Sequence, residues 1–115
     1  MAKNYMKHWY LVQFKPNAYA LAELNLKRQG FETFLPMQEA TNRKASRFVK
    51  HLKPLFPGYM FVSFDPGIIT WTKINSTYGV SKIITFNKKP AVISSDLILE
   101  LKNRYEINNN PRQKE

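Results

Sequence analysis

Five basic residues lie close together in the middle of the chain, and their type and spacing point most directly to a binding function. They are Arg43, Lys44, Arg47, Lys50 and Lys53, and no acidic residue occurs between Glu39 and Asp65. Cations at this density bind the phosphates of DNA or RNA without reading sequence, and salt weakens that binding steeply. The alternative is a solvated segment whose charge only aids solubility. Phe48 is the only aromatic residue there, which gives base stacking little support.

The charge of the whole chain agrees with a polyanionic partner. Its 115 residues hold 18 Lys and Arg against 8 Asp and Glu, a formal net charge of +10, and we expect the polyanion to be nucleic acid. No basic segment carries a sustained apolar helical face, and the apolar runs are too short to span a bilayer. With no cysteine and no signal-peptide core at the start, we expect a cytoplasmic monomer.

The sequence contains no group of residues with the pattern of a catalytic or metal site. His8 begins a predicted strand and His51 lies among the basic residues, and neither has a nearby carboxylate in sequence to orient it. The eight acidic residues are scattered rather than clustered as metal ligands. The glycines do not have the spacing of a phosphate-binding loop. We therefore expect no enzyme activity, no metal and no cofactor.

The second candidate site begins at residues 54–62, where a Pro-Gly turn leads into an apolar strand. Pro54 and Pro57 restrict the backbone, and Gly58 permits a positive φ. Alternation along the strand places Tyr59, Phe61 and Ser63 on one face and Met60, Val62 and Phe64 on the other. A strand that is apolar on both faces is either covered on both or has core on one and a docking surface on the other.

Aromatic residues near this strand form a candidate protein-binding surface. The chain has 16 aromatic residues (8 Phe, 6 Tyr, 2 Trp), and a domain of this size cannot bury all of them. The surface that we predict consists of Phe14, Phe56, Tyr59 and Phe61, extended by Ile98 and Leu101. An exposed aromatic patch favours a protein partner.

The first half of the chain predicts a strand, a helix and a second strand. The strand covers 8–14 and the following one 31–35. The helix between them is predicted to be capped by Asn17 and to end at Gly30, with a helical apolar stripe of Ala18, Leu21, Ala22 and Leu24. Residues 40–53 are then either a mobile, solvated loop or a β-arm joining two strands.

The second half predicts a short helix over 68–75 with Ile68, Trp71 and Ile74 on one face, and a strand over 80–86. A turn at 87–90 and an extended piece at 91–93 follow. Ser94 or Ser95 is expected to cap a last helix with the apolar face Leu97, Ile98, Leu101 and Tyr105. The fold class is therefore α+β, a mainly antiparallel sheet of about four strands flanked by helices. We expect one domain over residues 1–107 and a disordered tail or linker over 108–115.

Taken in order, these segments resemble the N-terminal domain of the NusG family of transcription elongation factors, and particularly its RfaH-like branch. The resemblance covers about residues 8 to 105. Its specific parts are Trp9-Tyr10, Leu35-Pro36-Met37, residues 54–62, Phe64-Asp65-Pro66, residues 74–80, Phe86 and Pro90-Ala91. It implies a factor that rides on bacterial RNA polymerase and changes pausing or termination, with upstream or non-template DNA beside its basic groups.

The resemblance also implies roles for individual residues. The family's apolar surface grips the clamp helices of the largest polymerase subunit, and here it corresponds to Phe56, Tyr59, Phe61, Ile98 and Leu101. A bridge across the main cleft would restrain clamp opening. The contact to the opposite wall, a His-Thr-Thr-Thr run in RfaH-like proteins, corresponds to Thr70, Trp71, Thr72 and Lys73. The DNA-reading positions correspond to Lys15, Thr77 and Tyr78.

Two features depart from the RfaH-like pattern. Trp71 is closer to the general NusG pattern, and Tyr78 stands where RfaH-like proteins have an arginine, so recognition of the same DNA element is not expected. The family's second domain, a KOW-type β-barrel, has no counterpart in the 115 residues. The alternative function is a basic DNA- or RNA-binding module without a polymerase partner, and a structural role in a larger assembly such as a ribosome is a weaker third.

Overall fold

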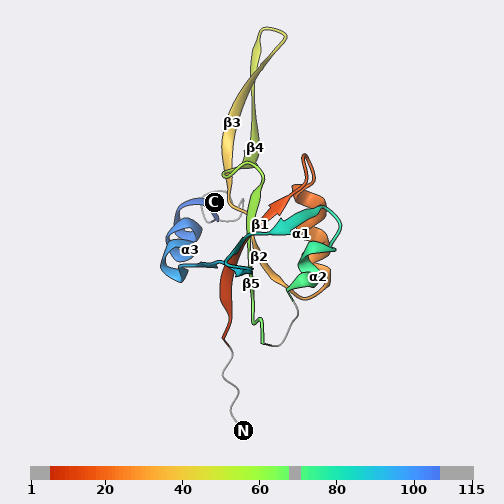
Figure 1. The fold of residues 1–115 in the computed structure, drawn as a ribbon. Helices are drawn as coiled ribbons and strands as arrows, with labels where there is room; N and C mark the ends of the chain where they lie inside the picture. The colour runs from red at the N-terminus through yellow and green to blue at the C-terminus, as the bar shows by residue number, and fades with distance from the viewer. Residues whose placement is uncertain (1–5, 68–70, 107–115) are drawn as a thin grey trace.

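The computed structural model describes residues 6–67 and 71–106, and within these ranges the chain forms nine strands and three α-helices (Figure 1). The strands are β1 (His8–Phe14), β2 (Glu32–Phe34), β3 (Met37–Lys44), β4 (Arg47–Pro54), β5 (Tyr59–Phe64), β6 (Val80–Ile83), β7 (Thr85–Phe86), β8 (Lys89–Pro90) and β9 (Val92–Ile93). The helices are α1 (Tyr19–Arg28), α2 (Thr72–Asn75) and α3 (Ser95–Leu101), and α3 continues as a π-helical turn over Lys102–Glu106. The proposed tail at 108–115 lies outside the described residues.

An antiparallel sheet with β1 and β5 at its centre organises the body. The strand order is β2-β5-β1-β6, and β9 also pairs with β1. Trp9 of β1 lies opposite Ser63 of β5 on one side and Ile93 of β9 on the other. The expected α+β architecture with a mainly antiparallel sheet is therefore confirmed, with β9 as an additional strand.

The two faces of the sheet pack against different helices. On one face Met60, Val62 and Phe64 of β5 join a core with residues of α1 and α2. On the other face Phe61 packs with Phe34 and with Ile98 of α3. Helices thus flank both sides of the sheet (Figure 1). The side chains of β5 alternate between the two cores, as predicted.

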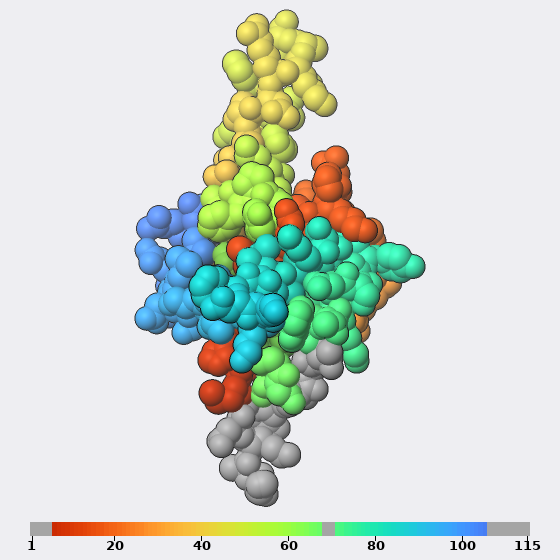
Figure 2. All heavy atoms as spheres, viewed as in Figure 1, coloured from red at the N-terminus to blue at the C-terminus, as the bar shows by residue number. Residues whose placement is uncertain are grey.

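Strands β3 and β4 leave the body as a long two-stranded ribbon, which we call the arm (residues 37–54). They pair in register from Met37 opposite Pro54 to Lys44 opposite Arg47. Ala45 and Ser46 form the tight turn at the tip, and both have positive φ, as a two-residue hairpin turn of type I′ requires. The arm projects well beyond the body (Figures 1 and 2). The sequence allowed either a mobile loop or a β-arm over residues 40–53, and the structure forms the β-arm.

Helix α1 differs from the prediction at its start and in its buried face. Ala18, not Asn17, is the N-cap residue, and it makes no side-chain capping bond. The buried residues are Ala22 and Leu26, whereas Leu21 and Leu24 are exposed. The reason is close packing at one point of the helix: a Cβ on Gly79 would lie 2.6 Å from the backbone nitrogen of Ala22, so residue 22 faces the body and must be small. Gly30, with φ +94°, ends the helix as expected.

The single strand predicted over 80–86 is wrong, because the structure has two separate strands there. The chain leaves β6 after Ile83 and forms a separate β7 that pairs with β8. The Ile84 amide donates a hydrogen bond to Leu11 in β1, and Ala91 donates one to Ile84, so Ile84 is a corner between two pairings. Of the short helix predicted over 68–75, residues 68–70 lie outside the described residues, and α2 covers Thr72–Asn75. Ser94 caps α3 through its hydroxyl.

Candidate functional site

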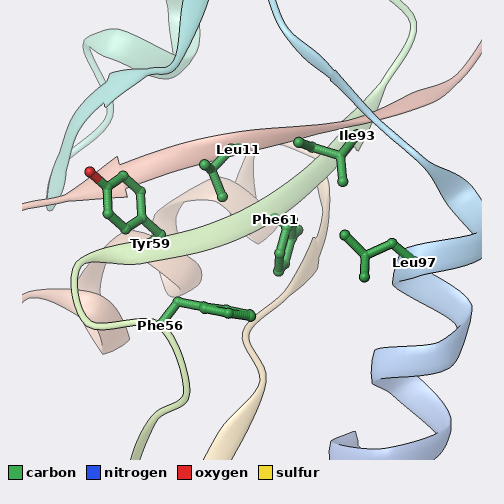
Figure 3. A pocket seen from close by; sticks show the side chains of 6 residues that line it. All are labelled: Leu11, Phe56, Tyr59, Phe61, Ile93 and Leu97. Carbon is green, nitrogen blue, oxygen red and sulfur yellow. The ribbon is translucent and has the colours of Figure 1, made fainter.

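An apolar cleft opens on the α3 face of the sheet. Its volume is about 240 Å³, and it is lined by Leu11, Phe56, Tyr59, Phe61, Ile93 and Leu97. These side chains come from β1, the turn before β5, β5 itself, β9 and α3, and they converge on one space (Figure 3). The Tyr59 hydroxyl is the only polar side-chain group among them. An apolar cleft of this kind suits the apolar surface of a binding partner, which it removes from water, and does not suit an ion.

The Pro-Gly turn places Phe56 over this cleft. The Leu55 amide donates to the Pro36 carbonyl at 2.8 Å, and the Tyr59 amide donates to the Phe56 carbonyl at 3.0 Å. Gly58 has φ +92°, which a side chain would disfavour. The turn thus holds Phe56 38 % exposed while Phe61 beneath it is 4 % exposed.

Three of the residues predicted for this surface have other positions. Phe14 is wrong as a cleft residue, because it alternates with Leu11 and Gln13 along β1 and is buried in the core on the opposite face. Ile98 is 2 % exposed and Leu101 packs beside it. Both pack in the cluster that contains Phe61, beneath the cleft, but neither lines it.

Leu11, Ile93 and Leu97 line the cleft and were missed as site residues. Alternation from Trp9 could have placed Leu11 on the same face as Phe61 once β1 and β5 were paired. Leu97 was predicted to lie on the apolar face of the last helix, yet it is 46 % exposed. No signal within the sequence pairs Ile93 with β1, because that contact depends on the corner at Ile84.

The arm holds its five cations in water. Arg43, Lys44, Arg47, Lys50 and Lys53 are all exposed. Ion pairs found in the described part of the chain, such as Lys27 with Glu23 and Lys102 with Glu32, belong to the body, and none includes a cation of the arm. Only Arg43 has an aromatic contact, with its guanidinium carbon 5.9 Å from the centre of the Phe48 ring. Phe48 itself is 73 % exposed.

The three residues proposed by resemblance to read DNA have unequal access to solvent. Lys15 and Tyr78 are exposed. Thr77 is buried, and its hydroxyl donates to the Lys73 carbonyl at 2.9 Å and accepts from Gln29 Nε2 at 2.7 Å. The structure therefore contradicts a direct contact by Thr77, which instead ties α2 to the end of α1.

Of the four residues compared with the opposite-wall contact, Trp71, Thr72 and Lys73 lie at α2, which packs on the other face of the sheet from the cleft. Thr70 lies outside the described residues. Trp71 packs partly buried against the core shared by α1 and α2, whereas Thr72 and Lys73 are exposed. His8 and His51 lie far apart in the fold, one on the central strand and one on the arm.

Across residues 6–67 and 71–106, no group of three or more His, Cys, Asp or Glu side chains is arranged to hold a metal ion. No helix in those ranges is both long and apolar enough to cross a bilayer.

Comparison with known proteins gives one family. The family model described as transcription termination factor NusG matches residues 7–102. A Helicobacter pylori (strain ATCC 700392 / 26695) transcription termination/antitermination protein NusG is 32% identical over 71 residues, which are 61% of this chain and 40% of that protein. The protein of the same name from Helicobacter pylori strain J99 is 43% identical over 42 residues, covering 36% of this chain and 24% of the relative. The chain thus aligns with less than half the length of these relatives.

A solved structure has the same fold. The NusG protein of Thermotoga maritima, determined to describe its domain interaction, superimposes with a TM-score of 0.56 at 18% identity, covering 84% of this chain and 56% of that one. Since the family match spans most of the chain, this protein belongs to the NusG family of transcription termination and antitermination factors.

Proposed function

We propose that this protein binds bacterial RNA polymerase through the apolar cleft and thereby changes pausing or termination. The observation that carries the proposal is the position of Phe56, a large aromatic side chain held half out of a cleft whose other walls are apolar. The names of the relatives support a role in transcription. The family resemblance favours the clamp helices of the largest subunit as the element that the cleft grips.

A helical partner fits the shape and chemistry of the cleft. An amphipathic helix presents apolar side chains at spacings of three and four residues, and it lays them into an apolar groove of this kind. Aromatic anchors such as Phe56 and Tyr59 commonly dominate the affinity of such interfaces. A factor bound there and also touching the opposite wall through Thr72 and Lys73 would favour the closed, forward-moving polymerase by binding that state better.

The experiment is a native gel shift of the reconstituted bacterial elongation complex with three proteins. These are the wild type, Phe56→Ser and Phe86→Ser. Phe86 is 72 % exposed and does not line the cleft, so it is a control for the general loss of an exposed aromatic ring. We expect Phe56→Ser to lose binding in moderate and high salt alike, and Phe86→Ser to bind as the wild type does. Normal binding by Phe56→Ser would refute the assignment of this surface.

A second candidate function is nucleic-acid binding without polymerase, and the unpaired cations of the arm favour it. It predicts binding to free DNA or RNA that weakens steeply with salt. Replacing Arg43, Lys44 and Arg47 by Ala would then reduce binding more than Phe56→Ser does. The same gel with free DNA in place of the elongation complex separates the two functions.

A further inference from the structure

The two faces of the arm carry different cations. Side chains alternate along a strand, and residues directly paired across two strands share a face. The register of β3 with β4 therefore separates the arm's basic residues into two sets. Lys44, Arg47, His51 and Lys53 share one face, which we call the basic face, whereas Arg43, Phe48 and Lys50 share the other.

The basic face leads to a groove at the base of the arm. The groove has a volume of about 410 Å³, and its walls include Phe14, Pro16, Tyr19, His51, Lys53 and Pro57. We call it the arm groove, and it is distinct from the apolar cleft, with which it shares no lining residue. The body segment around residues 15–17, orange-red in Figure 2, rises beside the base of the arm. His51 and Lys53 belong both to the basic face and to the groove.

The walls of the arm groove combine flat apolar surfaces with hydrogen-bonding and charged groups. The rings of Phe14 and Tyr19 lie 6.0 Å apart at an angle of 56°, and three prolines add rigid apolar surface. The Asn17 amide also lines the groove. This mixture is what the planar face and polar edge of a nucleobase require, and its volume is within the range of about 300–1,000 Å³ typical of small-molecule sites.

We propose that the basic face and the arm groove together form a binding site for single-stranded nucleic acid, with phosphates on the arm and one base in the groove. Lys44 and Arg47 at the tip and Lys53 at the base contact phosphates at separate points along the bound strand, and the strand ends its path at the groove. A base inside a duplex cannot enter such a groove without being extruded. The site therefore discriminates against a perfect duplex. This inference rests on the proposed role in transcription for its biological context. The binding itself should occur with the isolated chain, without polymerase.

The test uses the full 115-residue chain and fluorescence anisotropy at several salt concentrations. Its probes are a single-stranded oligonucleotide of about a dozen nucleotides, a length within the range that small single-strand-binding domains cover, the same strand with abasic sites, and its duplex. With three phosphate contacts, the logarithm of the binding constant should fall against the logarithm of salt with a slope of roughly −2 for the single strand. The abasic strand and the duplex should bind several-fold more weakly.

Matched variants test the face and the groove separately. Arg47→Gln and Lys53→Gln should each reduce the salt slope by about 0.7, whereas Lys50→Gln, on the opposite face of the same strand, should leave it unchanged. His51→Trp fills the groove and should remove the preference for bases over abasic sites. Val49→Trp, on the same face but nearer the tip, should retain that preference. All five positions are exposed, so their variants should fold, and circular dichroism verifies this.

Three results would overturn the proposal. Equal losses from Lys50→Gln and Arg47→Gln would mean that the charge has no preferred face. Equal binding of the three probes would mean that no base enters the groove. Equal competition by poly-glutamate would mean that any polyanion suffices. Phe56→Ser should bind the oligonucleotide as the wild type does, so a failure of the polymerase assignment remains distinguishable from a failure of this one.

Discussion

The rings of Phe56 and Phe61 meet edge to face, with their centres 5.9 Å apart and their planes at 87°. One ring reaches solvent and the other is buried, although only four residues lie between them in sequence. Phe61 also stacks on Phe34, with ring centres 5.9 Å apart. The exposed ring is thus supported by a buried aromatic pair, which holds it ready for a partner at little entropic cost on binding.

This relationship predicts that two truncations differ in how much stability they cost. Phe61→Ala empties a buried site and should lower the free energy of unfolding by about 3–5 kcal/mol. Phe56→Ala removes a ring that is already partly in water and should cost only about 1 kcal/mol. Urea denaturation followed by circular dichroism measures both. Similar losses in the two variants would mean that Phe56 belongs to the core rather than to an interface.

The close approach of Gly79 to α1 predicts a second difference, between two glycines. A methyl group on Gly79 would lie 2.6 Å from the Ala22 nitrogen and 2.9 Å from its Cα, whereas one on Gly30 would meet nothing within 4 Å. Both residues have positive φ. Gly30→Ala should therefore cost only the conformational strain, about 1–2 kcal/mol.

Gly79→Ala should cost clearly more, because the helix must move away as well. The midpoints of urea denaturation compare the two variants directly. If both midpoints fall equally, the contact between residue 79 and α1 is looser than the structure has it.

Tyr10 predicts how stability depends on alkaline pH. Burial raises the pKa of its phenol above the ordinary value of 10.0, and the nearby Asp65 carboxylate raises it further. Above pH 10 the unfolded chain releases this proton while the folded chain keeps it, so the unfolded state gains stability. The free energy of unfolding should therefore be unaffected by this group below pH 10 and decline above it.

Tyr10→Phe tests this, since it removes the ionisable group and keeps the ring that packs 4.6 Å from Phe64. The alkaline decline should become shallower in this variant, whereas Tyr78→Phe, which removes an exposed hydroxyl, should leave it as in the wild type. Denaturation midpoints between neutral pH and pH 11 give the slopes. An unchanged slope in Tyr10→Phe would assign the decline to other groups.

The sequence predicts the geometry of single elements better than their mutual arrangement. Alternation correctly predicts that Phe61 and Met60 point to different faces of the sheet, because the backbone sets the side-chain period of a strand. The buried face of α1 was wrong, because it depends on the approach of Gly79, which is distant in sequence. Phe14 failed for the same reason: an aromatic residue at a strand end suits either face, and only the pairing of β1 decides.

The candidate site shows the same division. Phe56, Tyr59 and Phe61 belong to one continuous segment, and their grouping could be predicted from it. Leu11 and Ile93 join them only through strand pairing, and Leu97 only through the docking of α3 on the sheet. The arm groove was also beyond prediction, since it forms between the arm and the end of β1.

The cap of α3 connects local structure to the cleft. The Ser94 hydroxyl accepts hydrogen bonds from the amides of Asp96 at 3.2 Å and of Leu97 at 3.5 Å, so it holds the backbone of a residue that lines the cleft. Ser94→Ala should cost about 1 kcal/mol of stability. It should also weaken polymerase binding, because the first turn of α3 then holds Leu97 less firmly.

Ser95→Ala is the matched control, since Ser95 lies in the same turn and is exposed, and the N-cap bonds come from Ser94. Its stability and its binding should both stay close to the wild type. Thermal denaturation measures the first quantity, and a titration of the elongation complex measures the second. If Ser94→Ala lowers stability but binds polymerase as tightly as Ser95→Ala does, the position of Leu97 does not limit binding, and the aromatic side chains alone carry the affinity of the cleft.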